Sequence, residues 1–206
     1  ELSTELAKNG KVEEAESVMQ EALTCAKSIG DDWEKRRALM AISTELSKQG
    51  KFDEALTCAR GISSDRAKSS VLKDISTELA KQVKVDEAAS AMHEALTYAR
   101  GISDDEEKCR ALKDISIELG KQGKVEEAAS VIQEALTCAR GIGSDRAKSS
   151  VLKDISTELA KQGKVVEAES AMQEALTCAR GISDDEEKSR ELSAISTELS
   201  NQGKVE

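Results

Sequence analysis

The side chains in this sequence that could carry chemistry are above all its five cysteines. Thiols can form disulfides or bind zinc, provided that their side chains converge on one point. Four of the five occupy the same place in a recurring word, Ala-Leu-Thr-Cys-Ala, at Cys25, Cys58, Cys138 and Cys178, and Tyr98 takes that place in a fifth copy. Equivalent positions of stacked repeats lie about one repeat apart. We therefore expect small, partly buried side chains on helices rather than a disulfide or a metal centre.

Cys109 stands alone in the sequence, and Ser189 takes the matching place in a later copy. The single histidine, His93, is replaced by glutamine in other copies, so we interpret it as an exposed, interchangeable polar residue. A catalytic or metal-binding role would need partners that the repeats do not supply. The sequence shows no nucleophile–base pair and no glycine-rich phosphate loop. We expect no enzymatic activity and no cofactor, and the free thiols favour a reducing compartment, the cytoplasm.

The phrase Ile-Ser-Thr-Glu-Leu defines the repeat that must position these side chains. Its copies begin 40, 33, 40, 40 and 40 residues apart, at Leu2, Ile42, Ile75, Ile115, Ile155 and Ile195. A period of this size indicates a stack of small units, each burying its apolar face against its neighbours. Residues 61–110 and 141–190 differ at only seven of 50 positions, so these copies should present nearly the same surface.

The composition excludes several classes of protein. The net charge is −10, with 40 acidic against 30 basic residues, which argues against electrostatic binding to nucleic acid or to an anionic membrane. No apolar stretch approaches the roughly 20 residues that span a bilayer. Proline is absent, aromatic residues make up 1% of the chain, and the strong helix formers Ala, Glu, Lys and Leu are abundant. We therefore expect an all-α protein with neither nucleic-acid nor membrane partners.

Residues 103–142 show how one repeat begins its first helix and ends it. The segment from Ser103 to Glu106 has the form of a capping box, with Ser103 as the N-cap. Apolar residues follow at spacings of three and four, and Gly123 can adopt the left-handed conformation that ends a helix. Val83 stands where other units have this glycine. If its backbone is left-handed, its side chain should cost on the order of 1 kcal/mol or more and could distort the turn.

A second helix is predicted from Val125 to Arg140, with an apolar stripe that includes Val125. Gly141 should end this helix in a Schellman-type turn, with Ile142 making the accompanying apolar contact. Two helices joined by so short a turn are antiparallel neighbours, an αα-hairpin. The unit that starts near Ile42 is seven residues shorter, and the loss falls in its second helix. Seven residues are nearly two helical turns, so the apolar stripe stays on almost the same face.

The 33-residue unit that begins at Arg36 resembles a tetratricopeptide repeat (TPR). The positions that match, in order, are Leu39, Ile42, Ser43, Leu46, Gly50, Ala55, Ala59 and Ile62. Leu46 and Ala59 replace aromatic residues, and Ala67 stands where a proline usually ends the motif. The 40-residue units look like the same motif with a longer second helix. The resemblance implies an all-α, right-handed αα-hairpin solenoid, a single continuous array of about five units over residues 1–206.

The resemblance also implies a concave groove, lined by the first helices, that holds a peptide or another protein. Carried over position by position, the groove residues are Arg37, Lys48, Lys73, Thr77, Lys81, Arg110, Lys113, Lys121, Lys153, Thr157, Lys161 and Arg190. This basic ladder would suit an acidic extended segment or a terminal carboxylate, with the acidic residues gathered on an outer face. Alternatively, these lysines only solvate helix ends, where a positive charge favours the helix dipole.

Two classes of function follow from this sequence. The first is a scaffold that binds a protein or peptide partner in the groove. The second is a structural protein that assembles with itself. The sequence starts inside the first helix of a repeat, and its last residues, 203–206, repeat the sequence of residues 10–13. Neither end carries the polar capping helix that closes most repeat arrays. We therefore expect either a segment of a longer array or a unit that stacks head to tail. Head-to-tail stacking would propagate as a filament or tube.

Overall fold

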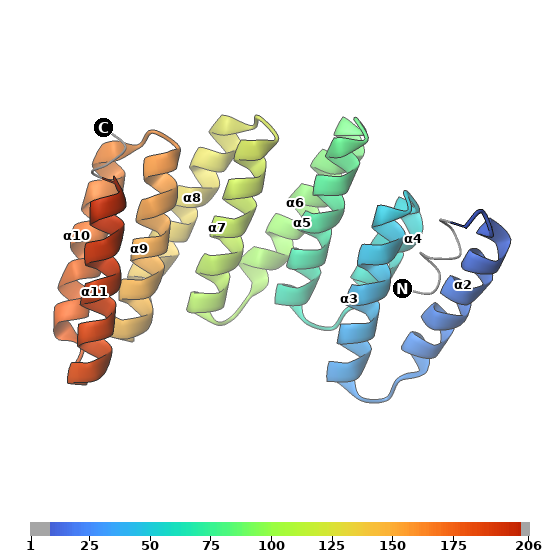
Figure 1. Cartoon of the computed structure of the whole chain (residues 1–206), viewed down its shortest axis with the longest axis horizontal. Coiled ribbons are helices and arrows are strands. Elements are labelled where there is room, and N and C mark those ends of the chain that lie inside the picture. Colours follow the sequence, from blue (N-terminus) through green and yellow to red (C-terminus); the bar gives the residue numbers. More distant parts are fainter. Residues whose placement is uncertain (1–8, 203–206) are drawn as a thin grey trace. The chain divides into compact units, whose positions relative to one another are not determined.

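The computed structural model describes residues 9–202, and every regular element in this part of the chain is an α-helix. The helices are α2 Val12–Ser28, α3 Asp32–Lys48, α4 Phe52–Arg60, α5 Asp65–Lys81, α6 Val85–Gly101, α7 Asp105–Lys121, α8 Val125–Arg140, α9 Asp145–Lys161, α10 Val165–Gly181 and α11 Asp185–Gln202 (Figure 1). The first copy of the repeated phrase, at Leu2, lies outside the described residues. Within the described range, no helix is long and apolar enough to cross a membrane. The prediction of an all-α fold is confirmed.

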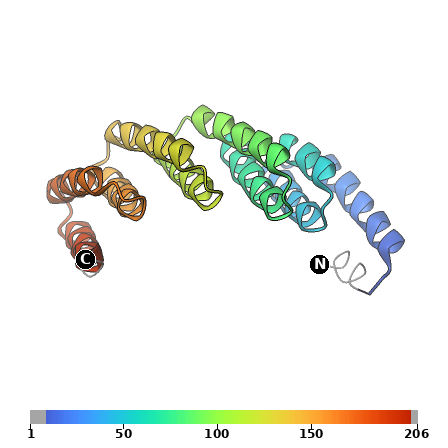
Figure 2. The ribbon, with the colours of Figure 1, turned by 90° about the horizontal axis from the view of Figure 1, so that it is seen from above.

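The helices form two compact units, Glu1–Gly101 and Ile102–Glu206. Each unit is built from αα-hairpins, α3–α4 and α5–α6 in the first and α7–α8 and α9–α10 in the second (Figure 2). We call α3, α5, α7, α9 and α11 the A helices, and α2, α4, α6, α8 and α10 the B helices. Inside a unit, an A helix packs on the next A helix and a B helix packs on the A helix that follows it. The predicted solenoid of hairpins is confirmed, whereas one continuous right-handed array over residues 1–206 stays a prediction.

The repeated phrase forms the centre of each hairpin. Its isoleucine and leucine are buried in α5, α7 and α9, and its serine is fully buried beside them. The serine hydroxyl donates a hydrogen bond to an alanine carbonyl oxygen in the first turn of the B helix of the same hairpin. These bonds are Ser43–Ala55, Ser76–Ala88 and Ser156–Ala168 at 2.7 Å and Ser116–Ala128 at 2.8 Å. A side chain this small lets the two helices approach, and the bond satisfies the hydroxyl that burial takes from water.

The A helices begin one residue later than the capping box predicts. In α7 the N-cap is Asp104, whose carboxylate accepts the backbone N–H of Glu107 at 2.8 Å. The prediction of Ser103 as N-cap is therefore wrong. A carboxylate accepts a stronger, charge-assisted hydrogen bond than a hydroxyl does, so the aspartate takes the capping position. In α5 and α9, which lack this aspartate, Ser64 and Ser144 cap at the same position.

The B helices match the predicted spans but end differently. Helix α8 has the predicted bounds, and α4 has nine residues against 16 in α8, as the shorter repeat predicts. Gly141 has a φ of −77°, and the N–H groups of Gly141 and Ile142 bond to carbonyls three residues back, at 2.9 and 3.2 Å. The expected Schellman-type ending is wrong, although Ile142 is buried. Val125 is 66% exposed, so the apolar stripe begins after it rather than at it.

The turns after α3, α5, α7 and α9 are left-handed, including the turn that contains a valine. Gly50, Gly123 and Gly163 have φ values of +78°, +78° and +75°, and Val83 has a φ of +62°. The turn at Val83 is not distorted. The next backbone N–H, that of Lys84, bonds to a carbonyl five residues back at 3.0 Å, and the equivalent bond after Gly123 is 2.9 Å. The Val83 side chain is 80% exposed, so little packing offsets its backbone strain.

Replacing Val83 by glycine should therefore stabilise the protein. We expect Val83→Gly to raise the free energy of unfolding by about 1 kcal/mol, because glycine adopts a positive φ without a steric penalty. Urea unfolding followed by circular dichroism measures the change. The matched control is Gly123→Val, which places the same side chain in the equivalent turn and should destabilise by a similar amount. A loss of stability in Val83→Gly would contradict the strain.

Two serines one turn apart on α3 should respond differently to the same substitution. Ser43 makes the buried hydrogen bond to Ala55, whereas the buried Ser47 hydroxyl has no hydrogen-bond partner among the described residues. We expect Ser43→Ala to lower the free energy of unfolding by about 1 kcal/mol and Ser47→Ala to leave it unchanged or raise it. Thermal and urea unfolding of the two variants test this. Equal losses would show that the Ser43 bond does not set the stability of the hairpin.

Candidate functional site

Two hollows lie on the A helices, one in each unit. The first, about 240 Å³, lies between α3 and α5 and is lined by Thr44, Ser47, Lys48, Val71, Asp74, Ile75, Thr77, Glu78 and Lys81. The second, about 330 Å³, lies among α7, α9 and α11 and is lined by Lys113, Ile117, Lys153, Asp154, Thr157, Glu158, Lys161, Ala194 and Glu198. We call them the A-helix hollows. They lie at related positions, because aspartate, threonine, glutamate and lysine at matching places of α5 and α9 line them.

The structure gathers part of the predicted groove set into these hollows. Lys48, Thr77 and Lys81 line the first, and Lys113, Lys153, Thr157 and Lys161 line the second. The remaining predicted residues line neither; they are Arg37, Lys73, Arg110, Lys121 and Arg190. The two threonines donate their hydroxyls to backbone carbonyls one turn back on their own helices, at 3.0 and 3.1 Å. They therefore present a methyl group and an acceptor oxygen to a ligand.

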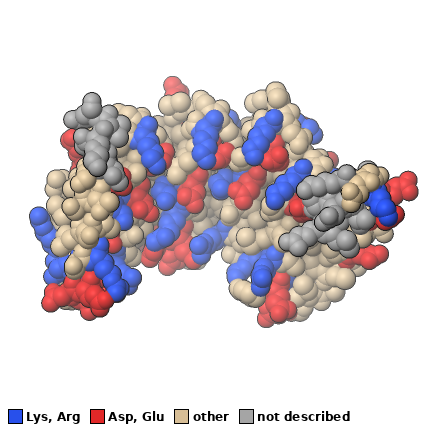
Figure 3. All heavy atoms as spheres, viewed as in Figure 1, with Lys and Arg blue, Asp and Glu red and all other residues tan. Residues whose placement is uncertain are grey.

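Acidic side chains share the A-helix hollows with the lysines. The hollow-lining carboxylates are Asp74, Glu78, Asp154, Glu158 and Glu198. Blue and red side chains alternate over the A helices in Figure 3. The prediction that the A helices form a basic ladder, with the acidic residues elsewhere, is wrong. Each aspartate directly follows a lysine and each glutamate directly follows a threonine, and one residue turns a helix by only about 100°, so both remain on the open side.

The lysines before the repeated phrase are already engaged within the protein. Their ion pairs are Lys73–Asp74 at 2.8 Å, Lys113–Asp154 at 3.6 Å and Lys153–Glu191 at 4.0 Å. The last two join neighbouring A helices of the second unit. About a fifth of each lysine side chain is exposed. Lys113 and Lys153 therefore hold neighbouring A helices together, and all three lysines offer little free charge to a ligand.

The other predicted cations divide into paired and unpaired ones. Lys81 and Lys121 pair with glutamates one turn back, at 3.1 and 3.2 Å. Arg110 and Arg190 pair with Glu106 and Glu186 of their own helices, and the Arg37 guanidinium lies 5.3 Å from the centre of the Trp33 ring. By contrast, Lys48 and Lys161 have no carboxylate within ion-pair distance in the described chain. These two lysines are the cations that remain available in the hollows.

The glutamate one turn before Lys161 bonds to a glutamine instead of to this lysine. Glu158 accepts a hydrogen bond from Gln162 Nε2 at 3.1 Å, and the same nitrogen donates to Ser116 Oγ at 3.0 Å. This contact links the end of α9 to the buried serine of α7. The sequence alone gave no signal for it, because it joins residues of two different hairpins.

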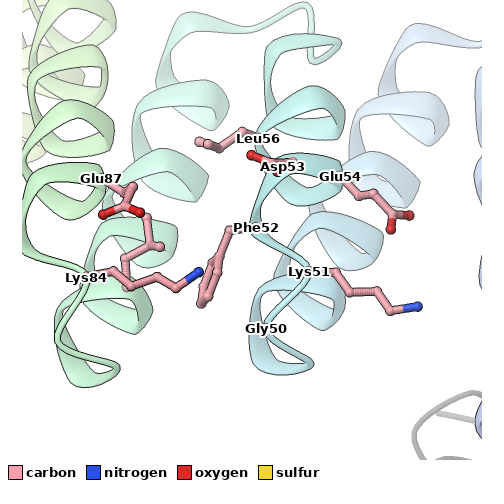
Figure 4. A pocket seen from close by; sticks show the side chains of 9 residues that line it. Gly50, Lys51, Phe52, Asp53, Glu54, Leu56, Lys84 and Glu87 are labelled. Carbon is pink, nitrogen blue, oxygen red and sulfur yellow. The ribbon is translucent and has the colours of Figure 1, made fainter.

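A third hollow, of about 250 Å³, lies at the start of α4 and includes residues of α5 and α6. Figure 4 shows the Lys84 amine directed at the Phe52 ring, and the nitrogen lies 5.0 Å from the ring centre, a cation–π contact. Sequence reasoning missed this hollow. The signal was present in the replacement of valine by phenylalanine at this position. In the structure Phe52 is buried, whereas the equivalent Val125 and Val165 are exposed. The lysine already occupies the ring face, so the hollow is weaker as a ligand site than those on the A helices.

The B helices carry a different pattern, a bidentate ion pair between successive hairpins. Arg60 binds Glu94 in the first unit, with N–O distances of 2.9 to 3.3 Å. Arg140 binds Glu174 in the second, with distances of 2.9 and 2.6 Å. The Arg140 guanidinium holds the pKa of the Glu174 carboxyl below its usual value through this hydrogen bond. The charges of the B face are therefore used to join repeats.

Comparisons with known proteins agree with a helical-repeat fold. A family model described as PPR repeat matches residues 5–25. Ton1535 from Thermococcus onnurineus NA1 aligns over 94% of this chain and 56% of its own, with 18% identity and a TM-score of 0.54, so this chain spans about half of that protein. No curated protein matches significantly.

Two further solved structures align over most of this chain. A putative kinesin light chain from Podospora anserina, with nearly identical TPR-like repeats, aligns over 89% of this chain and 94% of its own, with 12% identity and a TM-score of 0.48. BtubC (BKLC) from P. vanneervenii aligns over 87% of this chain and 78% of its own, with 15% identity and a TM-score of 0.47. The repeated phrase, the αα-hairpins and the matching repeat model together show a protein with an αα-hairpin helical-repeat fold.

Proposed function

We propose that this protein is a scaffold that binds an extended polypeptide segment along its A helices. The observation that carries the proposal is the repetition of the same hollow in both units, with threonine, lysine, aspartate and glutamate at equivalent places. A surface that repeats with the fold suits a ligand that also repeats, as the backbone of an extended peptide does. A segment that fits one hollow can therefore fit the other.

The dimensions and charges of the hollows indicate the chemistry of the segment. Volumes of about 240 and 330 Å³ lie at or below the lower end for small-molecule pockets, so they suit single side chains better than a cofactor. Lys48 and Lys161 offer one unpaired cation in each hollow. We therefore propose that each hollow takes a segment that places an acidic side chain at the unpaired lysine of that hollow. The neighbouring residues of the segment would contact the threonine of the same hollow.

Substitution of the two unpaired lysines tests the binding face. Peptides selected from a display library on the full chain serve as the probe, and fluorescence polarisation gives their Kd. We expect Lys48→Glu and Lys161→Glu each to weaken binding at its own hollow about threefold or more, and the double variant to weaken binding at both hollows. Wild-type binding should also weaken with salt, because exposed charge pairs are screened.

Lys27→Glu and Arg180→Glu are matched controls for these variants. Lys27 and Arg180 lie in the last turns of B helices α2 and α10, and Lys48 and Lys161 lie in the last turns of A helices α3 and α9. Replacement by glutamate therefore changes the charge equally and disturbs the helix dipole equally in all four variants. The controls should change the Kd less than twofold. Equal weakening by hollow and control variants would reject the A-helix face as the binding site. Substitution of Lys113 or Lys153 tests it less cleanly, because their ion pairs hold A helices together.

Head-to-tail self-assembly, the alternative from the sequence, stays a prediction. The ion pairs between successive B helices are the kind of contact that a second copy would have to repeat. Light scattering over a series of protein concentrations separates the two functions. A monomer at every concentration would reject assembly and leave the scaffold proposal unaffected.

A further inference from the structure

Cys109 and Cys138 meet across the α7–α8 hairpin, although the sequence suggests that Cys109 stands alone. The Cys138 thiol donates a weak hydrogen bond to the backbone oxygen of Asp105, with a sulfur–oxygen distance of 3.6 Å. In an α-helix the carbonyl of Asp105 is also the acceptor for the backbone N–H of Cys109, four residues on. Helical side chains lean towards the N-terminus, so the Cys109 side chain leans towards this same turn.

The two thiols differ in their environments. Cys109 is fully buried, whereas Cys138 is partly exposed. Burial raises the pKa of the Cys109 thiol, and a side-chain hydrogen bond with Cys138 raises it further. The Cys138 sulfur is therefore the one that a reagent in solution reaches first. The Cys109 sulfur lies behind it, protected from solvent but next to its partner.

This pair occurs in the α7–α8 hairpin and not in the α9–α10 hairpin that follows it. At the position of Cys109, α5 and α9 carry Ser69 and Ser149, both buried. The residue facing Ser149 in the α9–α10 hairpin, by the same spacing of 29 residues, is Cys178. The protein thus contains its own control, a hairpin of related sequence with serine in place of one thiol. Sequence reasoning compared equivalent positions of different repeats and so missed a contact within one repeat.

We propose that Cys109 and Cys138 are a dithiol site that forms an intramolecular disulfide by exchange with a small-molecule disulfide. The Cys138 thiolate attacks one sulfur of the reagent, forming a mixed disulfide and releasing one reagent thiol. The Cys109 thiol then loses its proton and attacks the Cys138 sulfur, which releases the second reagent thiol. Two protein thiols are oxidised and one reagent disulfide is reduced to two thiols. The new bond ties helix α7 to helix α8.

The test uses the full chain, reduced and then incubated in native buffer with oxidised glutathione. Intact-mass measurement and peptide mapping follow the products. We expect a loss of about 2 Da and a cross-linked peptide that contains Cys109 and Cys138. The reaction should speed up as the pH rises, because the second step needs the Cys109 thiolate.

Two variants make the result specific to this hairpin. Cys109→Ser, which copies the neighbouring hairpins, should stop at a glutathione adduct on Cys138. Ser149→Cys should gain a second cross-link, to Cys178, because the α9–α10 hairpin has the same geometry. The proposal is overturned if Cys109 stays reduced while glutathione accumulates on Cys138, if Cys138 does not react, or if the linked peptide forms only in urea. Cross-links that scramble equally among Cys25, Cys58 and Cys138 would overturn it as well.

Discussion

A buried serine hydroxyl bonded to an alanine carbonyl of the facing helix is the contact on which each hairpin depends. It joins Ser116 of α7 to Ala128 of α8, and the same bond recurs in the other described hairpins. Small residues on both sides let the helices approach closely, and the directional bond sets how far one helix slides along the other. This register places the isoleucine and the leucine of the repeated phrase in the core. The residue that directly follows the serine then faces the hollow.

The charges of this protein are used mainly between its own helices. On the A face, Lys113 reaches Asp154 of the next A helix, and on the B face Arg140 reaches Glu174 of the next B helix. Exposed ion pairs of this kind contribute little stability individually, but each one removes a charge from those that a partner can contact. Of the basic residues predicted to line a binding groove, only Lys48 and Lys161 therefore remain available to a ligand in the hollows, beside the threonines.

The near-identity of the repeats makes each local exception informative. Val83 keeps the left-handed turn of the glycines it replaces, so the hairpin contacts impose that backbone on an unsuitable residue. Phe52 is buried where a valine is exposed, and Lys84 covers its ring. Cys109 takes the place of a buried serine and brings a second thiol to Cys138. In each case the neighbouring repeat shows what the same position does without the change.

Much of the fold could be predicted from the sequence. The period, the hairpins, the bounds of α8 and the shortened α4 follow from local spacing, because a helix and its turn depend on residues a few positions apart. The Asp104 cap, the lysine partners and the meeting of Cys109 with Cys138 were decided only by tertiary structure. Those outcomes depend on competition between neighbouring groups or on contacts between separate helices, and a repeated one-dimensional pattern does not contain the distances that settle them.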